Sequence, residues 1–255
     1  KRAKLSEEYS IIIIQQNYNE RFEKLINKFE FSNLKIIKTS YPHRWNSYKK
    51  MTLNGYKGFE YCFDKIHCDI GFYLEDDIMV SSDFFLFCEK MLEKYKNDKN
   101  FFAVNGFSKE PFNIKKIQLY SKFVFGIGKG WAINKDRWKI IKKIWSPKFI
   151  NSTNPEYDYP IENYIKKNYF YVVMPACSRT YELPSNGVSV KKNDKEYFKS
   201  FKNSFVKIDN KNLNFRYSYF VNYNWRKDCK KYKGKLIGFF ILNFKLIKKK
   251  LFNKI

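Results

Sequence analysis

The feature that most constrains the fold is a short apolar run that ends in three acids. Residues 70–74 (Ile-Gly-Phe-Tyr-Leu) are typical of a buried strand, and Glu75, Asp76 and Asp77 follow without a break. Three adjacent carboxylates repel one another, which raises the pKa of at least one of them unless a cation is supplied. The run therefore predicts a strand that ends at a ligand-binding edge of a sheet.

The acidic triplet suits a hard divalent cation. Mn²⁺ and Mg²⁺ take oxygen ligands and are commonly held by one or two carboxylates together with substrate phosphates. We expect Mn²⁺ (or Mg²⁺) to bridge the triplet to a nucleotide diphosphate. The alternative is a solvated turn in which the acids bind nothing.

Short strands and helices alternate along the first three quarters of the chain. Apolar runs indicate strands at 11–14, 34–37, 101–104 and 131–133, and helical periodicity indicates helices at about 20–29, 52–63 and 136–144. Ser82 and Asp83 are expected to cap a further helix. This order predicts a three-layer α/β/α sandwich around a mixed, mainly parallel sheet.

Charge and cysteine content restrict the partners and the compartment. The 255 residues include 50 Lys and Arg against 25 Asp and Glu, a formal net charge of +25 that favours an anionic partner. Five cysteines without paired spacing favour a reducing compartment, and no signal peptide or membrane-spanning run is apparent. A nucleic-acid-binding protein is a third alternative, because lysines are interleaved with aromatic residues, but it leaves the acids unexplained.

The residues around the triplet resemble a known signature. Leu74 to Ile78, followed by Val80 to Phe85, resembles the EDD-L-x-x-(A/S)-P-D-F-F motif of the N-acetylglucosaminyltransferase I family. The resemblance implies a GT-A nucleotide-diphospho-sugar transferase fold and metal-dependent, inverting glycosyl transfer. It places Asp77 on the metal, Glu75 on the donor sugar and Asp76 near the nucleotide ribose.

Two later blocks are similar to other motifs of the same family. Residues 128–131 (Gly-Lys-Gly-Trp) are similar to its G-x-G-W turn, which implies that Lys129, Gly130 and Trp131 lie beside the donor sugar. Residues 174–180 and 187–189 are similar to P-x-x-S-R-T and G-V-S. By this resemblance Arg179, Val188 and Ser189 contact the donor, the last two from a loop that meets its phosphates.

The resemblance also implies a catalytic base. Counting back from Ser178, the aromatic-Asp pair of the family falls on Tyr157 and Asp158, with tyrosine in place of tryptophan. An inverting transfer needs one carboxylate to take the proton of the incoming hydroxyl, and Asp158 is assigned that task. Glu162, one helical turn later, is the second candidate.

Some positions depart from the family pattern. Asn17 stands where the family has an acid against the uracil ring, Asn54 where it has a histidine near the nucleotide, and Lys129 where it has an apolar residue. The family's sheet also begins one strand earlier than Ile11. These departures leave the identity of the sugar and the base open.

The sequence predicts three segments: a GT-A domain in residues 1–190, a lysine-rich extension in 191–234 and a basic hydrophobic tail in 235–255. The tail either lies on an anionic membrane surface or packs on the domain. The expected function is transfer of a sugar, with N-acetylglucosamine as the family candidate, from a UDP-type donor to a glycan or lipid-linked acceptor. Lipopolysaccharide or capsule synthesis at the cytoplasmic face of the membrane would suit it. The alternative is a degenerate, non-catalytic relative that binds membrane or glycan.

Overall fold

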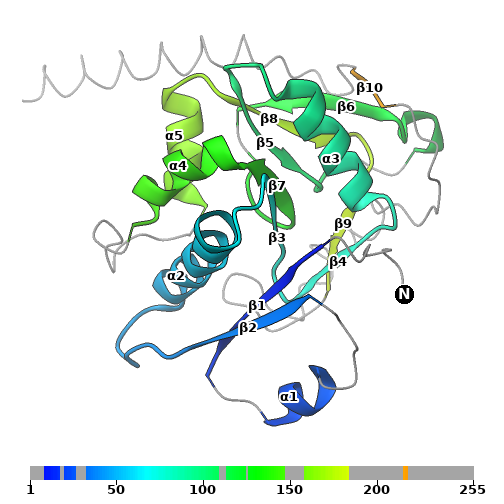
Figure 1. Ribbon diagram of the computed structural model, residues 1–255. Helices are drawn as coiled ribbons and strands as arrows, with labels where there is room; N and C mark the ends of the chain where they lie inside the picture. Colours follow the sequence, from blue (N-terminus) through cyan, green and yellow to red (C-terminus); the bar gives the residue numbers. More distant parts are fainter. Residues whose placement is uncertain are drawn as a thin grey trace, which may run out of the picture.

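The computed structural model describes residues 9–17, 20–26, 33–108, 113–124, 126–146, 158–183 and 215–217. Helices lie against a central sheet in this part of the chain (Figure 1). The strands are β1 (Ile11–Gln16), β2 (Leu34–Thr39), β3 (Ile70–Tyr73), β4 (Ile78–Val80), β5 (Phe101–Asn105), β6 (Leu119–Phe123), β7 (Trp131–Asn134), β8 (Tyr171–Pro175), β9 (Thr180–Glu182) and β10 (Arg216–Tyr217). The α-helices are α1 (Glu20–Ile26), α2 (Ser47–Glu60), α3 (Phe84–Tyr95), α4 (Lys135–Ile144) and α5 (Tyr159–Lys167).

The central sheet has the order β10-β6-β8-β5-β7-β3, and β1-β2 and β4-β9 form two further pairs. The expected mixed sheet is confirmed, but it is less parallel than predicted. Among the described strands, β1-β2, β5-β8 and β6-β10 pair in parallel, whereas β3-β7, β5-β7, β6-β8 and β4-β9 are antiparallel. Two of the antiparallel pairs arise because β7 lies between β3 and β5 and runs against both, and a third arises because β6 runs against β8.

Side chains of the central strands alternate between two cores. Trp131 and Ile133 of β7 point to a core that includes residues of α2, α4 and α5, whereas Ala132 between them points to the core beneath α3. Val172 and Val173 of β8 divide in the same way. Because a strand has a period of two, this alternation places helices on both faces of the sheet. The predicted three-layer sandwich is confirmed.

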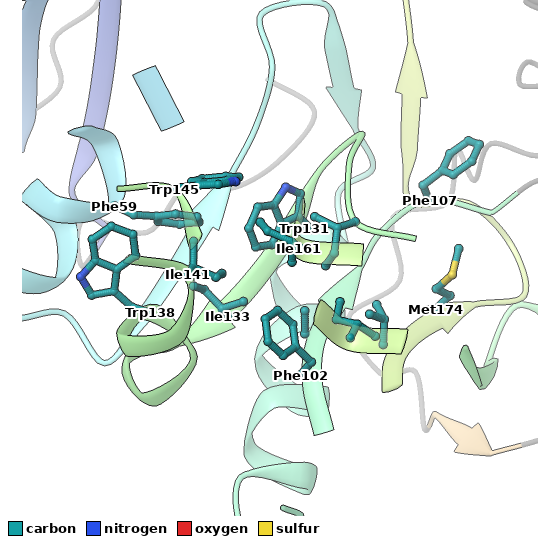
Figure 2. Packing of buried hydrophobic residues seen from close by; sticks show 14 of the residues in the cluster. Phe59, Phe102, Phe107, Trp131, Ile133, Trp138, Ile141, Trp145, Ile161 and Met174 are labelled. Carbon is teal, nitrogen blue, oxygen red and sulfur yellow. The ribbon is translucent and has the colours of Figure 1, made fainter. Parts of the chain in front are cut away.

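Aromatic rings fill the core on the α2 face (Figure 2). The Phe59 ring lies 5.3 Å from Trp131, 5.9 Å from Trp138 and 6.2 Å from Trp145, measured between centroids. All three tryptophans are buried. Aromatic packing of this kind gives the strands around the acidic triplet a rigid support.

The start of α2 and the capping of α3 differ from the sequence expectation. Helix α2 begins at Ser47 rather than near Thr52, because the Asn46 side chain accepts the Lys49 N–H at 2.8 Å and caps the helix. A π-helical turn, Tyr61–Lys65, continues it. Asp83 precedes α3 as predicted, yet its side chain makes no capping hydrogen bond. Its carboxylate instead accepts from Ser81 Oγ and pairs with Arg179.

A short part of the lysine-rich extension joins the central sheet. Strand β10 pairs with β6, and the preceding Phe215 is buried with its ring 5.0 Å from that of Phe87. The sheet therefore includes residues beyond position 190. Within the described residues, no helix has the length and apolar character needed to cross a bilayer.

Candidate active site

The acidic triplet lies on a loop whose main chain is held at two points. The carbonyl of Glu75 accepts the Ile78 N–H at 3.1 Å, and the carbonyl of Asp77 accepts the Leu183 N–H at 2.7 Å. The second bond extends the β4-β9 pair, so the segment after residue 178 directly supports the triplet. Asp76 is exposed, whereas Glu75 and Asp77 are partly buried.

Tyr73 is influenced by the charges of both the triplet and Asp158. Its ring packs 5.6 Å from Trp131 and 6.2 Å from Trp145, and its pKa is raised, first by burial and then by nearby carboxylates. The carboxylates that act on its hydroxyl are Glu75, Asp76, Asp158 and Asp77. Asp158, although distant in the sequence, thus raises the pKa of the same buried hydroxyl as the triplet does.

The two candidate bases have different surroundings. Asp158 stands at the N-terminal end of α5, where its side chain makes no helix-capping hydrogen bond. Glu162 accepts the Gly126 N–H at 2.9 Å and pairs with Lys166 at 3.4 Å, both through its carboxylate. The Glu162 carboxylate thus links α5 to the loop before β7 through a hydrogen bond. The two carboxylates therefore differ in their surroundings, although they lie only one helical turn apart.

The Gly128 to Trp131 turn packs directly against the triplet strand. Gly130 has a φ of +89°, and a Cβ added there would lie 2.6 Å from Thr180 Cγ2 and 3.2 Å from Leu74 Cδ2. Lys129, with a φ of +55°, forms an ion pair with Glu182 on β9. Three blocks that are distant in the sequence therefore meet here: the triplet, the glycine turn and the segment around Thr180.

Two predicted donor residues are fully enclosed by protein. Trp131 has none of its surface exposed, and its ring belongs to the aromatic core of Figure 2. Arg179 is likewise 0% exposed, and its guanidinium is engaged by Asp83 and by main-chain carbonyls. Neither side chain is placed to touch a donor, so the proposed donor site does not include them.

The two asparagines form a second polar group, at the carboxyl ends of β1 and β2. Asn54 of α2 accepts from Tyr41 and Thr39 at 2.9 and 3.1 Å and donates to Gln16 at 3.2 Å. Asn17, with a φ of +65°, follows β1 and donates its N–H to the Thr39 carbonyl. The carboxyl edge of parallel strands is where open α/β sheets bind ligands.

Comparison with known proteins decides the family. Residues 2–238 match the GNT-I family, a span that covers nearly the whole chain. The protein belongs to the GNT-I family. The mixed sheet between helical layers agrees with the GT-A fold of this glycosyltransferase family. The predicted fold and the predicted glycosyltransferase class are thereby confirmed.

One solved structure and the curated proteins complete the comparison. The chain is similar to a crystal structure of a glycosyltransferase involved in the glycosylation of the major capsid of PBCV-1, at 12% sequence identity. That match has a TM-score of 0.37 and covers 75% of this chain and 99% of the other. No curated protein matches the sequence.

GNT-I family enzymes are typically metal-dependent, and the residues present fit such an ion. Among the described residues, no group of three or more His, Cys, Asp or Glu side chains could hold a metal by itself. A hard cation held by one carboxylate, waters and a diphosphate needs no such group. Asp77, partly buried on a loop held by β9, suits a site that the substrate completes.

Several predictions concern residues that lie outside the described part of the chain: Tyr157, Val188, Ser189 and the tail at 235–255. Conversely, Tyr73 and Glu182 were not singled out from the sequence, although the structure places both at the site. The signal for Tyr73 was its position in the strand just before the triplet. Glu182 had no local signal, because its importance comes from its ion pair with Lys129.

Proposed function

We propose that this GNT-I family member transfers a sugar, with N-acetylglucosamine as the first candidate, from a nucleotide-diphosphate donor to a glycan or glycolipid hydroxyl with inversion. The observation that supports this most is that the triplet loop, the glycine turn and the segment around Thr180 meet in the structure. The three acids of the loop, together with Asp158, are enough to divide two tasks. One task is binding the donor, and the other is accepting a proton.

The roles proposed for the acids are those that the family resemblance implies. Glu75 would bind the donor sugar and Asp76, which is exposed, the nucleotide ribose. Asp158 would accept the proton of the acceptor hydroxyl as that oxygen attacks the anomeric carbon from the face opposite the diphosphate. Inversion follows because the new bond forms as the bond to the diphosphate breaks on the other side.

Asp77 would hold Mn²⁺ or Mg²⁺ together with the donor phosphates. When bound, such an ion would stabilise negative charge on the departing diphosphate as a Lewis acid. The protein contributes the rigid loop, because the Leu183 N–H fixes the Asp77 carbonyl at 2.7 Å. Asn17 and Asn54 would bind the nucleotide base by neutral hydrogen bonds, at the edge formed by β1 and β2.

The test is a screen of nucleotide sugars against the full chain, with and without Mn²⁺. A true donor is expected to raise the melting temperature only when Mn²⁺ is present, since binding at 100 times Kd adds about 2.7 kcal/mol of stability. Release of free nucleotide from the same donor, measured over hours, then reports turnover. UDP sugars are tested beside GDP and TDP sugars to identify the base.

The screen also tests the rival function. Stabilisation by donor and Mn²⁺ without nucleotide release, even with glycan acceptors added, would favour a degenerate relative that only binds. No stabilisation by any donor would contradict the proposed donor site itself.

A further inference from the structure

Arg179 is the most deeply enclosed charged residue near the site. Its side chain is 0% exposed, and that of its partner Asp83 is 2% exposed, with Nε and Oδ2 3.3 Å apart. The guanidinium also donates to the carbonyl of Cys177 at 2.7 Å and to that of Ile117. The rings of Phe87 and Phe215 lie 5.1 and 5.4 Å from its central carbon.

A charge in such a place is costly unless its partners are well placed. Removing two ions from water has a large desolvation cost, and a buried pair is therefore weak grounds for inferring added stability. The Asp83 carboxylate is itself satisfied by Ser81 Oγ at 2.6 Å as well as by Arg179. Both charged groups therefore have partners, and their ion pair joins the residue before β9 to the residue before α3.

The main chain of Arg179 lies between the elements that shape the site. Its N–H donates to the Gly106 carbonyl at 2.7 Å, and its carbonyl accepts the Ser81 N–H at 2.8 Å. Strand β9 begins at the next residue and pairs with β4, and just after β9 the Leu183 N–H binds the Asp77 carbonyl of the triplet. A shift of Arg179 would thus displace the strand that holds Asp77.

We infer that Arg179, locked by Asp83, is a positioning residue that sets the place of the Asp77 carboxylate through β9 and does not bind the donor phosphates. This inference rests on the proposed function for its consequence, which is metal and diphosphate binding. The effect of Arg179 on the position of the β4-β9 pair does not depend on the proposed function.

Asp83 provides the sharpest test, because its enclosed carboxylate repels phosphate and cannot serve as a donor ligand. Asp83→Asn, Arg179→Lys and Arg179→Met are compared with the wild type for binding of Mn²⁺ and UDP, measured by titration well below each melting temperature. Positioning predicts that Asp83→Asn weakens Mn²⁺ binding in the presence of UDP by roughly 10- to 100-fold, as loss of outer-shell support does at metal sites. Arg179→Met is expected to match it.

A matched control separates positioning from a loss of stability. Tyr171→Phe removes a buried hydroxyl that donates to Asp98 at 2.5 Å, a hydrogen bond in which neither the triplet nor β9 takes part. It is expected to lower the melting temperature without changing Mn²⁺ affinity. Arg179→Lys keeps the charge that pairs with Asp83 and is expected to retain part of the affinity. If Asp83→Asn behaves like the Tyr171→Phe control, or if Arg179→Met binds Mn²⁺ and UDP as the wild type does, the inference is overturned.

A second measurement is independent of activity. Hydrogen exchange at the Ile78 and Leu183 amides is expected to accelerate in Asp83→Asn and to stay unchanged in Tyr171→Phe. Unchanged exchange at both amides would overturn the positioning role. A wild-type protein that fails to bind Mn²⁺ and UDP, with exchange altered as expected, would instead count against the proposed function and support the positioning of the loop.

Discussion

At the scale of single residues, the division of work among the acids is the main conclusion. Asp158 and Glu162 have the same chemistry and lie one turn apart, but Glu162 is held by the Gly126 N–H and Lys166. Asp158 instead shares the surroundings of the triplet around Tyr73. The difference lies in the neighbours of each carboxylate, which the sequence does not show.

This difference predicts the result of removing each carboxylate. Asp158→Asn should lower kcat by about 10²- to 10⁴-fold, the usual contribution of a general base, while donor affinity changes little. Glu162→Gln keeps an oxygen that can accept the Gly126 N–H and should lose far less. Steady-state kinetics and donor titration on both variants decide the assignment, which is reversed if Glu162→Gln is the inactive one.

Asp98 allows a prediction about pH. Burial acts to raise its pKa, but hydrogen bonds from Tyr171 and the Asn100 N–H, together with Lys122, lower it below the usual 3.8 overall. A carboxylate with a lowered folded pKa stabilises the protein above its unfolded pKa, and that contribution is lost as pH falls through the folded value.

Asp98→Asn should therefore lower the melting temperature at pH 7, by roughly 2–4 °C per kcal/mol lost. The gap between variant and wild type should shrink as the pH falls below about 3.8, the unperturbed value. Thermal unfolding from pH 7 to pH 3 measures this. A gap that is the same at every pH would show that the lost packing, not the charge, is responsible.

At the scale of elements, the glycine turn before β7 makes a close contact with the segment around Thr180. Gly130 combines a φ of +89° with a neighbour, Thr180 Cγ2, only 2.6 Å from where a Cβ would lie. A side chain there would force apart the turn and β9, the two segments that flank the triplet strand. Backbone conformation and space both require glycine at this position.

Gly130→Ala should accordingly lower the free energy of unfolding by about 1–3 kcal/mol and reduce activity further than that loss explains. Gly58→Ala is the matched control, because in helix α2 an added Cβ would meet Ile14 at an ordinary 3.5 Å. It should raise stability by roughly 0.5–1 kcal/mol. Denaturant unfolding checks both, and equal effects of the two changes would contradict this account.

At the scale of the whole molecule, one edge of the central sheet is formed by β10, a strand from far along the chain. Phe215, 6% exposed, packs beneath β10 against Phe87 and faces the Arg179 guanidinium. Phe215, well beyond residue 190, thus contributes to the core on the α3 side. The lysine-rich composition of the segment after residue 190 alone favoured an appendage.

Phe215→Ala should consequently destabilise the protein by about 3–5 kcal/mol, as large-to-small changes of a buried phenylalanine do. Denaturant unfolding of the full chain measures the loss, and Phe215→Leu should restore most of it. A loss below about 0.5 kcal/mol, the usual range for surface changes, would show that this segment does not pack on the sheet.

Local patterns were sufficient to predict most elements and the site's central loop. Runs such as Ile11 to Ile14 and the apolar spacing of α3 specify strand or helix because burial of one face selects the period. Helix capping was predicted less well. Asn46 caps α2 before the apolar pattern of that helix begins. Asp83 forms an ion pair with Arg179 and makes no capping hydrogen bond to α3. Strand direction was also missed, because pairing partners such as β7 and β3 are distant in the sequence.

The sequence by itself determined the acidic triplet, the strand that presents it and the family to which the chain belongs, because each of these is a matter of adjacent residues. Only the tertiary structure decided which charged groups are enclosed or paired within the fold. Arg179 and Lys129 have the chemistry of phosphate ligands, yet one is enclosed beside Asp83 and the other paired with Glu182. The residue type sets the charge of a side chain, but the neighbours that folding brings to it determine whether that charge can bind a ligand.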